Sequence, residues 1–264
     1  PPLHDGYVDT HNGGCNSVPP VFQPITYDWH PDPITFCGTS GWYDGNHRDT
    51  DWLFVDLEDS ALSIRDAQLL LQTAEAGVPC LVRVPASDAV WIKKTLDIGA
   101  AGIVVPQVLT AEHARQAVAH CKYPPQGIRS VGIARAHGYG AGFADYVHSA
   151  NDEVVTVVQI EHIDTVAKIA EIVGVAGIDC LFVGPYDLSA SMGKLGQVAD
   201  PDVQRAISTV RQQAMRAGIP LGIFGATAEA VQPFVQSGYT LIAVGIDTLL
   251  VTAAAKGVLE SVNS

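Results

Sequence analysis

Short runs of β-branched and other apolar residues alternate with longer amphipathic runs from about residue 34, and this alternation constrains the fold more than any other feature of the chain. Continuous apolar runs are typical of parallel strands that are buried on both faces. Gly, Pro and Asp separate the two kinds of run, as they do at turns. We expect strands at Ile34–Tyr43, Trp52–Asp56, Cys80–Val84, Gly102–Pro106, Val154–Glu161, Cys180–Gly184, Pro220–Phe224 and Thr240–Gly245.

The amphipathic runs predict a helix after most of these strands. Several begin at Ser, Thr or Asp, the residue types that cap helix N-termini. We expect helices at Ser60–Ala76, Ala89–Ile98, Ala111–His120, Thr165–Ile172, Asp202–Ala217, Thr227–Ser237 and Thr248–Leu259.

Eight alternations in about 230 residues predict an α/β chain folded as a (β/α)8 TIM barrel over residues 34–264. A doubly wound open sheet is the alternative, but the sequence has no GxGxxG or GxxxxGK[ST] turn. Residues 1–33 contain seven prolines and are predicted to form an extended N-terminal arm. The connection Lys122–Asn151 is long, and connections of that length are commonly functional or disordered.

Composition excludes several partners. The chain has 15 Lys and Arg against 28 Asp and Glu, a formal net charge of -13, which repels nucleic acid. No run of 18 apolar residues predicts a membrane span. Five cysteines at wide spacings, without a CxxC pair, favour reduced thiols and a cytoplasmic location, and Cys80 and Cys180 are expected to be buried as small apolar residues.

Polar residues follow several of the expected strands. In a barrel of this kind, the carboxyl ends of the strands surround the active site. The candidates are Asp56, Glu58, Asp59, Arg83, Gln159, Glu161, Asp187 and Asp247.

Glu161 and Asp187 follow two consecutive apolar strands. Carboxylates at neighbouring strand ends can converge on one hard divalent cation, which prefers oxygen ligands. The alternative is that each carboxylate caps the helix that follows it. We expect these two residues to be the metal ligands.

Arg83 lies on an apolar strand, where a buried guanidinium requires an anionic partner. A substrate carboxylate would satisfy it. A structural ion pair with Glu58 or Asp56 would also do so, and the two interpretations are compatible.

Six segments, in chain order, carry a family resemblance: Asp51–Asp59 (DWLFVDLED), Val82–Pro85 (VRVP), Ile92–Gly102, Tyr123–Arg129 (YPPQGIR), Gln159–Glu161 (QIE) and Phe182–Ser189 (FVGPYDLS). Together they resemble the HpcH/HpaI aldolase and citrate lyase β-subunit family over roughly four fifths of the chain. The resemblance implies a (β/α)8 barrel that exchanges its C-terminal helix with a neighbour. The implied assembly is a homo-oligomer, a hexamer or a trimer of dimers.

The resemblance also implies a divalent metal ion, Mg, Mn or Co, held by Glu161 and Asp187. It implies that Arg83 contacts the substrate, that Glu58 holds a water at the metal, and that main-chain donors near Gly184–Asp187 bind the carboxylate of pyruvate. Further residues of the matched segments are expected to bind substrate: Gln159, Pro185, Tyr186 and Arg129.

The implied reaction is cleavage of a 4-hydroxy-2-oxo acid to pyruvate and an aldehyde. Leu57-Glu58-Asp59 resembles the citrate lyase branch instead, so a lyase for malyl-CoA or citramalyl-CoA is the alternative, and a non-catalytic binder of oxo acids is a third. A Schiff-base aldolase would need a lysine on a strand, and none of the six lysines lies on an expected one.

The aldolase branch has His where this chain has Asp59, which leaves the proton-transfer residue open. Asp59 beside Asp97 is one candidate, because two close carboxyls can share a proton. A histidine from elsewhere is the other. His137 is the best placed of these by its position in the sequence, ahead of His11 and His47.

Overall fold

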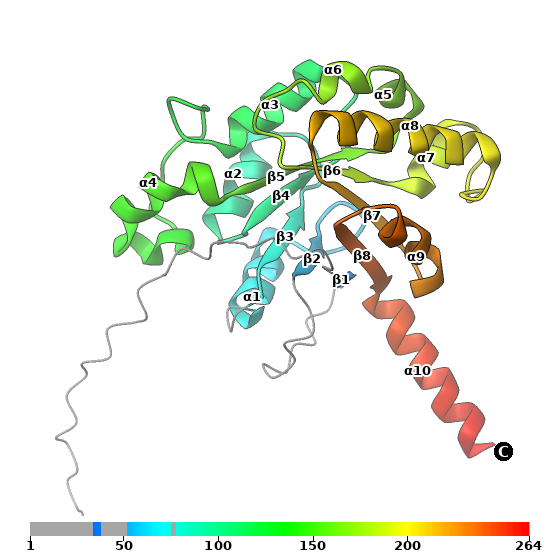
Figure 1. Ribbon diagram of the computed structural model, residues 1–264. Helices are drawn as coiled ribbons and strands as arrows, with labels where there is room; N and C mark the ends of the chain where they lie inside the picture. Colours follow the sequence, from blue (N-terminus) through cyan, green and yellow to red (C-terminus); the bar gives the residue numbers. More distant parts are fainter. Residues whose placement is uncertain (1–33, 38–51, 75–77, 264) are drawn as a thin grey trace, which may run out of the picture.

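The computed structural model describes residues 34–37, 52–74 and 78–263. Within these ranges, eight parallel strands pair in chain order, and β1 pairs with β8 to close the barrel (Figure 1). The strands are β1 Ile34–Cys37, β2 Leu53–Asp56, β3 Cys80–Arg83, β4 Gly102–Val105, β5 Val155–Ile160, β6 Cys180–Val183, β7 Leu221–Gly225 and β8 Leu241–Ile246.

Helices follow the strands and surround the sheet. They are α1 Ile64–Ala74, α2 Ala89–Asp97, α3 Ala111–Cys121, η1 Arg135–Gly140, α4 Phe143–Glu153, α5 Ile163–Ala167, α6 Ile169–Ile172, α7 Pro185–Ser191, α8 Pro201–Ala217, α9 Ala228–Gln236 and α10 Asp247–Val262. This parallel, alternating arrangement is that of a (β/α)8-type barrel. The expected arm of residues 1–33 and the end of the first expected strand lie outside the described residues.

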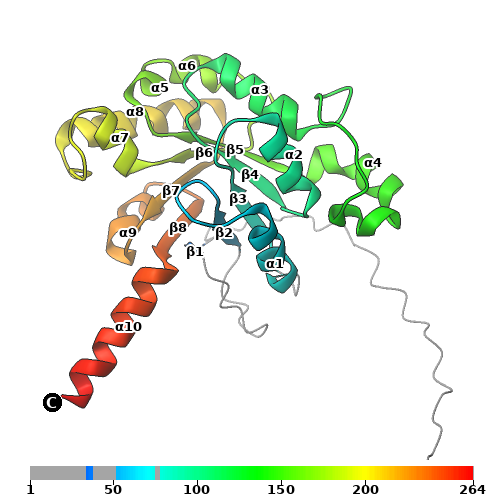
Figure 2. The ribbon, with the colours of Figure 1, turned by 180° about the vertical axis from the view of Figure 1, so that it is seen from behind.

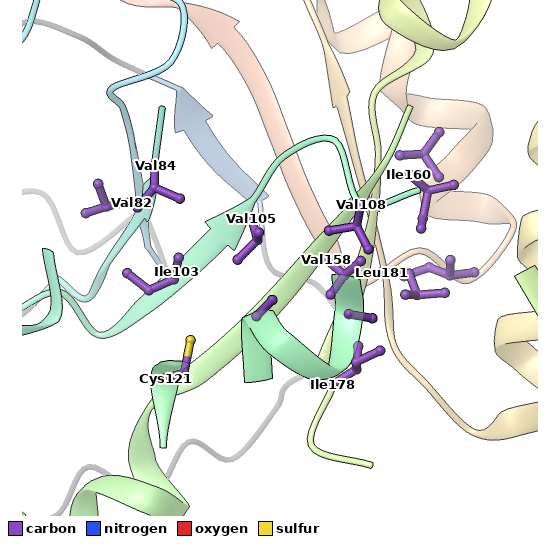
Figure 3. Packing of buried hydrophobic residues seen from close by; sticks show 14 of the residues in the cluster. Val82, Val84, Ile103, Val105, Val108, Cys121, Val158, Ile160, Ile178 and Leu181 are labelled. Atoms are coloured by element: carbon purple, nitrogen blue, oxygen red, sulfur yellow. The ribbon is translucent and has the colours of Figure 1, made fainter. Parts of the chain in front are cut away.

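Side chains alternate between two faces of the strands, as the two-residue period of a strand requires. One set fills the barrel interior around Trp52, Phe54 and Phe182, whose neighbouring rings lie 6.0 and 5.7 Å apart. The other set packs against the helices; Figure 3 shows Val82, Ile103 and other members of this cluster.

The same alternation aims polar side chains into the barrel mouth. Phe54 and Leu81 face inward, so Asp56 and Arg83, two residues further along their strands, also face inward. Asp56 and Arg83 are register partners in the β2–β3 pair. The register therefore brings an acid and a base together at the carboxyl end of the barrel.

Helix α1 begins later than expected, at Ile64 instead of Ser60. The Ser60 hydroxyl bonds to the Asp56 carbonyl oxygen, which ties Ser60 to the strand end. Ser63 and Asp66 then form a reciprocal cap: the Ser63 N–H donates to Asp66 Oδ2 at 2.8 Å and the Asp66 N–H donates to the Ser63 hydroxyl at 3.3 Å. The helix starts directly after this cap.

The connection between β4 and β5 contains more structure than the sequence indicates. It holds η1 and the eleven-residue helix α4, neither of which was expected. Lys122 anchors it, because its buried ammonium donates to the carbonyl oxygens of Asn151 and Val154 at 2.7 and 2.8 Å. The segment is an ordered part of the fold.

Helix α10 has no buried residue, and Figures 1 and 2 both show it projecting away from the barrel. Leu249, Leu250, Val251, Val258 and Leu259 are between 47% and 64% exposed. No helix among the described residues is long and apolar enough to span a membrane. Cys80 and Cys180 are buried, as expected.

Glycine is required inside the barrel where large rings fill it. A Cβ at Gly222 would overlap Cδ2 of Phe182 and approach the Leu241 carbonyl oxygen to 3.0 Å. We predict that Gly222→Ala lowers the free energy of unfolding by about 1–3 kcal/mol, since overpacking forces neighbouring side chains to shift.

Urea denaturation provides the measurement. Gly142→Ala is the matched control, because the φ of Gly142 is -109° and a Cβ there would lie 3.6 Å from the His137 carbonyl oxygen, an ordinary van der Waals distance. It should change the free energy of unfolding by no more than about 1 kcal/mol. Equal effects of the two substitutions would contradict the packing argument.

Candidate active site

Five strand ends bring charged and amide side chains to one mouth of the barrel. Asp56, Glu58 and Asp59 end or follow β2, and Arg83 ends β3. The remaining members are Gln107 after β4, Gln159 and Glu161 at the end of β5, and Asp187 in the first turn of α7, after β6.

Arg83 is the centre of an ion-pair cluster. Its Nε and Nη2 donate to the two oxygens of Asp56 at 2.8 and 2.5 Å, a bidentate pair. Its Nη1 lies 3.0 Å from Glu58 Oε2, and its Nη2 also donates to Asp59 Oδ2 at 2.9 Å. The ion-pair interpretation of Arg83 is therefore confirmed with both expected partners, and Asp59 is a third.

Burial differs among the three carboxylates. The side chains of Asp56 and Glu58 are 11% and 15% exposed, whereas that of Asp59 is 71% exposed. The Arg83 guanidinium is therefore paired with three carboxylates. Asp56 and Glu58 are largely buried, whereas Asp59 is exposed to water. The cluster keeps a net negative charge.

Glu58 is the carboxyl whose protonation the site perturbs most clearly. Burial raises the pKa of Glu58 to about 7; the Arg83 guanidinium opposes this, and the carboxylates of Glu161, Asp59 and Asp56 add to it. A group with a pKa near neutrality can both accept and release a proton under ordinary conditions.

Glu161 is buried and held from two directions. The Gln107 backbone N–H donates to its Oε1 at 2.6 Å, and the Gln159 side-chain amide donates to its Oε2. Burial raises the pKa of Glu161, and the nearby charge of Asp187 raises it further, against these hydrogen bonds. The Glu161 and Asp187 carboxylates are thus close enough to repel each other.

Helix capping does not account for these two acids. His162, not Glu161, is the N-cap of α5, and its ring accepts from the Asp164 N–H. Gly184 is the N-cap of α7, so Asp187 lies inside the first turn. The capping alternative is not supported for either residue.

The donor set fits a hard divalent cation. The described residues contain no group of three or more His, Cys, Asp or Glu side chains suited to a metal ion, but magnesium is commonly held by one or two carboxylates together with waters and substrate. Oε1 of Gln159 is buried and has no hydrogen-bond partner in the described part of the chain. A Cβ at Gly184 would lie 3.3 Å from Glu161 Oε2, so the glycine leaves space beside that carboxylate.

Gln107 is the residue of this site that the sequence did not indicate. Its φ of +54° is unusual for a residue other than glycine, and its N–H donates to Glu161. Its side-chain Nε2 lies 3.5 Å from Glu58 Oε1. The position of Gln107 directly after the fourth expected strand could have indicated it as a site residue. Its backbone conformation could not be predicted from the sequence.

Asp97 and Arg129 form a separate cluster. Arg129 donates to Asp97 Oδ1 at 2.9 Å and lies over the Tyr123 ring, 4.5 Å from its centroid. Asp97 is the last residue of α2, and a helix that follows a barrel strand returns toward the strands' amino ends. The structure therefore does not place Asp97 beside Asp59 in this chain.

His137 belongs to the same distant region. It is 4% exposed; its Nδ1 accepts from the Gly140 N–H at 3.0 Å and its Nε2 lies 2.8 Å from the Gly132 carbonyl oxygen. Its ring packs edge-on against Phe143, 5.3 Å away. These contacts hold the His137 ring within the η1–α4 segment, away from the mouth of the barrel.

Comparison with known proteins identifies the family. The sequence profile of HpcH/HpaI aldolase/citrate lyase matches residues 44–254. The chain belongs to this family. It is 40% identical over 211 residues to a 2-dehydro-3,6-dideoxy-6-sulfogluconate aldolase of Pseudomonas putida, covering 79% of this chain and 82% of that one. It is 41% identical to a hydroxypyruvate/pyruvate aldolase of Sagittula stellata, covering 78% and 81%.

A solved structure agrees with this assignment. An HpcH/HpaI aldolase/citrate lyase family protein from Burkholderia cenocepacia J2315 superposes with a TM-score of 0.81 at 33% identity, covering 89% of this chain and 96% of that one. The family is one of class II aldolases, so the chain is an enzyme of the carbon–carbon lyase type.

Arg83 is expected to stabilise this HpcH/HpaI family member mainly above neutral pH. We predict that Arg83→Met lowers the free energy of unfolding by about 3 kcal/mol at pH 8, since it leaves confined carboxylates unpaired. Arg83 lowers the pKa of Glu58. Its removal therefore raises that pKa in the folded state, and the destabilisation shrinks as pH falls and the carboxyl binds its proton.

Denaturant unfolding of metal-free protein at pH 5 and pH 8 measures this effect. Arg115→Met is the matched control: Arg115 pairs with Glu112 at 2.9 Å, but both side chains are more than half exposed. It should cost no more than about 1 kcal/mol at either pH. A loss for Arg83→Met that is as small, or independent of pH, would contradict the assigned role.

Proposed function

We propose that the protein is a divalent-metal-dependent aldolase that cleaves a 4-hydroxy-2-oxo acid to pyruvate and an aldehyde. The observation that carries the proposal is the placement of Glu161 directly after β5 and of Asp187 in the first turn after the adjacent strand β6. The two carboxylates repel each other, since the charge of Asp187 raises the pKa of Glu161. A cation between them relieves that repulsion. Relatives at about 40% identity that are named as aldolases support the same chemistry.

Glu161 and Asp187 would hold the cation, Mg, Mn or Co, together with the 2-oxo acid. When bound, it supplies Lewis-acid polarisation of the substrate's oxo group. Gln159 would keep Glu161 in place, since its amide donates to Glu161 Oε2, and its own Oε1 is buried without a hydrogen-bond partner among the described residues.

Arg83 would face the negative charge that develops when the bond between C3 and C4 breaks. The electron pair of that bond moves toward the 2-oxo oxygen, and a fixed guanidinium stabilises charge there without reorganising. Hydrogen bonds to Asp56 and Asp59 engage Nε and both donors of Nη2, while Nη1 lies 3.0 Å from Glu58 Oε2. Nη1 would therefore present a donor to a substrate oxygen.

Glu58 would take the proton from the 4-hydroxyl group, which becomes the aldehyde carbonyl. The proton would return to C3 to form the methyl group of pyruvate. A pKa of about 7 suits both directions of this transfer. Asp59, more exposed and bonded to Arg83, would hold the guanidinium in position.

Main-chain groups of Gly184, Pro185 and Tyr186, at the start of α7, would border the substrate carboxylate. We leave Asp97, Arg129 and His137 out of the proposed site, because their described contacts lie with one another and with the η1–α4 segment.

We predict that Glu161→Gln and Asp187→Asn each lower the metal-dependent release of pyruvate by roughly 100-fold or more, because each removes a charged ligand. Pyruvate is followed with several 4-hydroxy-2-oxo acids across Mg, Mn and Co. Glu229→Gln, on the exposed first turn of α9, is the control and should retain full activity.

Two results would refute the proposal. Turnover of malyl-CoA or citramalyl-CoA without turnover of any oxo acid would favour the thioester lyase. Metal-dependent pyruvate binding in calorimetry, without pyruvate release or exchange of its methyl protons in D2O, would favour a non-catalytic binder.

We further propose that the protein is a homo-oligomer in which α10 packs on a neighbouring copy. Its apolar side chains are exposed and the helix stands clear of its own barrel (Figures 1 and 2). An exposed apolar surface of this kind is typical of an association site.

We predict that the double substitution Val258→Asp and Leu259→Asp lowers the molar mass in solution to that of a smaller assembly, because charged residues oppose burial of the helix. Multi-angle light scattering measures it. Lys256→Gln on the same helix is the control and should leave the mass unchanged. A wild-type monomer, or unchanged mass in the double variant, would contradict the exchange.

A further inference from the structure

A cavity lies beside the carboxylates, between the loops that follow β3 and β4. Its volume is about 250 Å³, and it is bordered by Pro85, Ala86, Ser87 and Pro106 together with residues of α3. Pockets for drug-sized ligands measure roughly 300–1,000 Å³. The cavity is therefore suited to a short chain.

Gln107 connects this cavity to the site of the proposed reaction. It lines the cavity, its N–H donates to Glu161 at 2.6 Å, and its side-chain amide lies 3.5 Å from Glu58. One residue thus borders both the group that would bind the oxo acid and the group that would take the proton. A substrate anchored at Glu161 can extend past Gln107 into the cavity.

Three residues of the polar lining, Ser87, Gln107 and Gln116, are neutral groups that both donate and accept. Ser87 contributes a hydroxyl and Gln107 an amide. The Gln116 amide donates to Glu112 Oε1 at 3.2 Å, which leaves its carbonyl oxygen to accept. The Leu109 N–H approaches His113 Nδ1 at 3.5 Å, which leaves the other ring nitrogen, Nε2, for a ligand.

This lining favours hydroxyl groups over an anion. None of the described residues that line the cavity is Lys or Arg, and Glu112 lies one turn before Gln116 on α3. A carboxylate only accepts hydrogen bonds and needs a cationic partner when it leaves water. A hydroxyl both donates and accepts, as these side chains do.

We propose that this cavity receives the aldehyde-derived end of the substrate and selects chains that carry hydroxyl groups. The inference rests on the proposed aldolase function and specifies its substrate class. The hydroxylated 4-hydroxy-2-oxo acid places its oxo acid end at Glu161 and its remaining hydroxyls against Ser87, Gln107, His113 and Gln116.

Aldol addition of pyruvate to three aldehydes tests the assignment: glyceraldehyde, propanal, which has the same carbon number but no hydroxyls, and anionic succinic semialdehyde. The wild-type kcat/KM should be roughly tenfold or more higher for glyceraldehyde than for propanal. Gln116→Leu should reduce that ratio several-fold, since it removes a hydrogen-bonding partner without adding charge.

Gln72→Leu is the matched control, on an exposed position of α1, and should leave the ratio unchanged. Ser87→Ala is a second variant with the same expected direction, should Gln116→Leu fail to fold. A wild-type ratio near one, a preference for succinic semialdehyde, or a ratio that neither variant changes would overturn the assignment while leaving the aldolase function intact. Absence of addition to all three aldehydes, together with no cleavage of any oxo acid, would refute both.

Discussion

The charge balance around Arg83 is the constraint on which the mouth of the barrel depends. Three carboxylates follow β2, and two of them are largely withdrawn from water. Such an arrangement is unfavourable unless a cation lies among them. The β2–β3 register supplies that cation by making Arg83 the direct partner of Asp56, above the Phe54 ring. The same pairing leaves Arg83 and its three carboxylates with a net negative charge. That charge would favour a divalent cation at Glu161 and Asp187.

Strand direction explains why these groups converge. All the strands are parallel, so residues far apart in the sequence reach the same end of the barrel when they occupy the ends of different strands. For this reason the alternation of apolar and amphipathic runs predicted the barrel. The polar residues at the strand ends predicted the position of Arg83 and the placement of Glu161 and Asp187 on neighbouring strands. The hydrophobic pattern carries that information because interior and exterior faces of each strand must both be buried.

Specific features of the chain explain why the sequence analysis grouped Asp97, Arg129 and His137 with the site and overlooked Gln107. Asp97 was associated with Asp59 through the resemblance, although its position at the end of α2 sends it to the opposite end of the barrel within one chain. His137 and Arg129 lie in the long connection between β4 and β5, and their partners are Asp97, tyrosine rings and backbone groups. Gln107 was missed because its contribution comes from a backbone N–H in a left-handed conformation. No composition or spacing rule reports such a contact.

The Leu57-Glu58-Asp59 sequence leaves the proton acceptor open, and the surroundings of the two acids support the proposal of Glu58 over Asp59. Asp59 is exposed and bound to Arg83, so it is poorly confined for transfer to a buried substrate. The Glu58 side chain is only 15% exposed, and burial together with three neighbouring carboxylates raises its pKa to about 7. Efficient proton transfer needs a group whose pKa is close to the working pH and whose position is fixed. Glu58 suits this role in the proposed mechanism, since Arg83 Nη1 lies 3.0 Å from one of its oxygens and Gln107 Nε2 lies 3.5 Å from the other. In that mechanism Asp59 is not the base, and its charge adds to those that raise the pKa of Glu58.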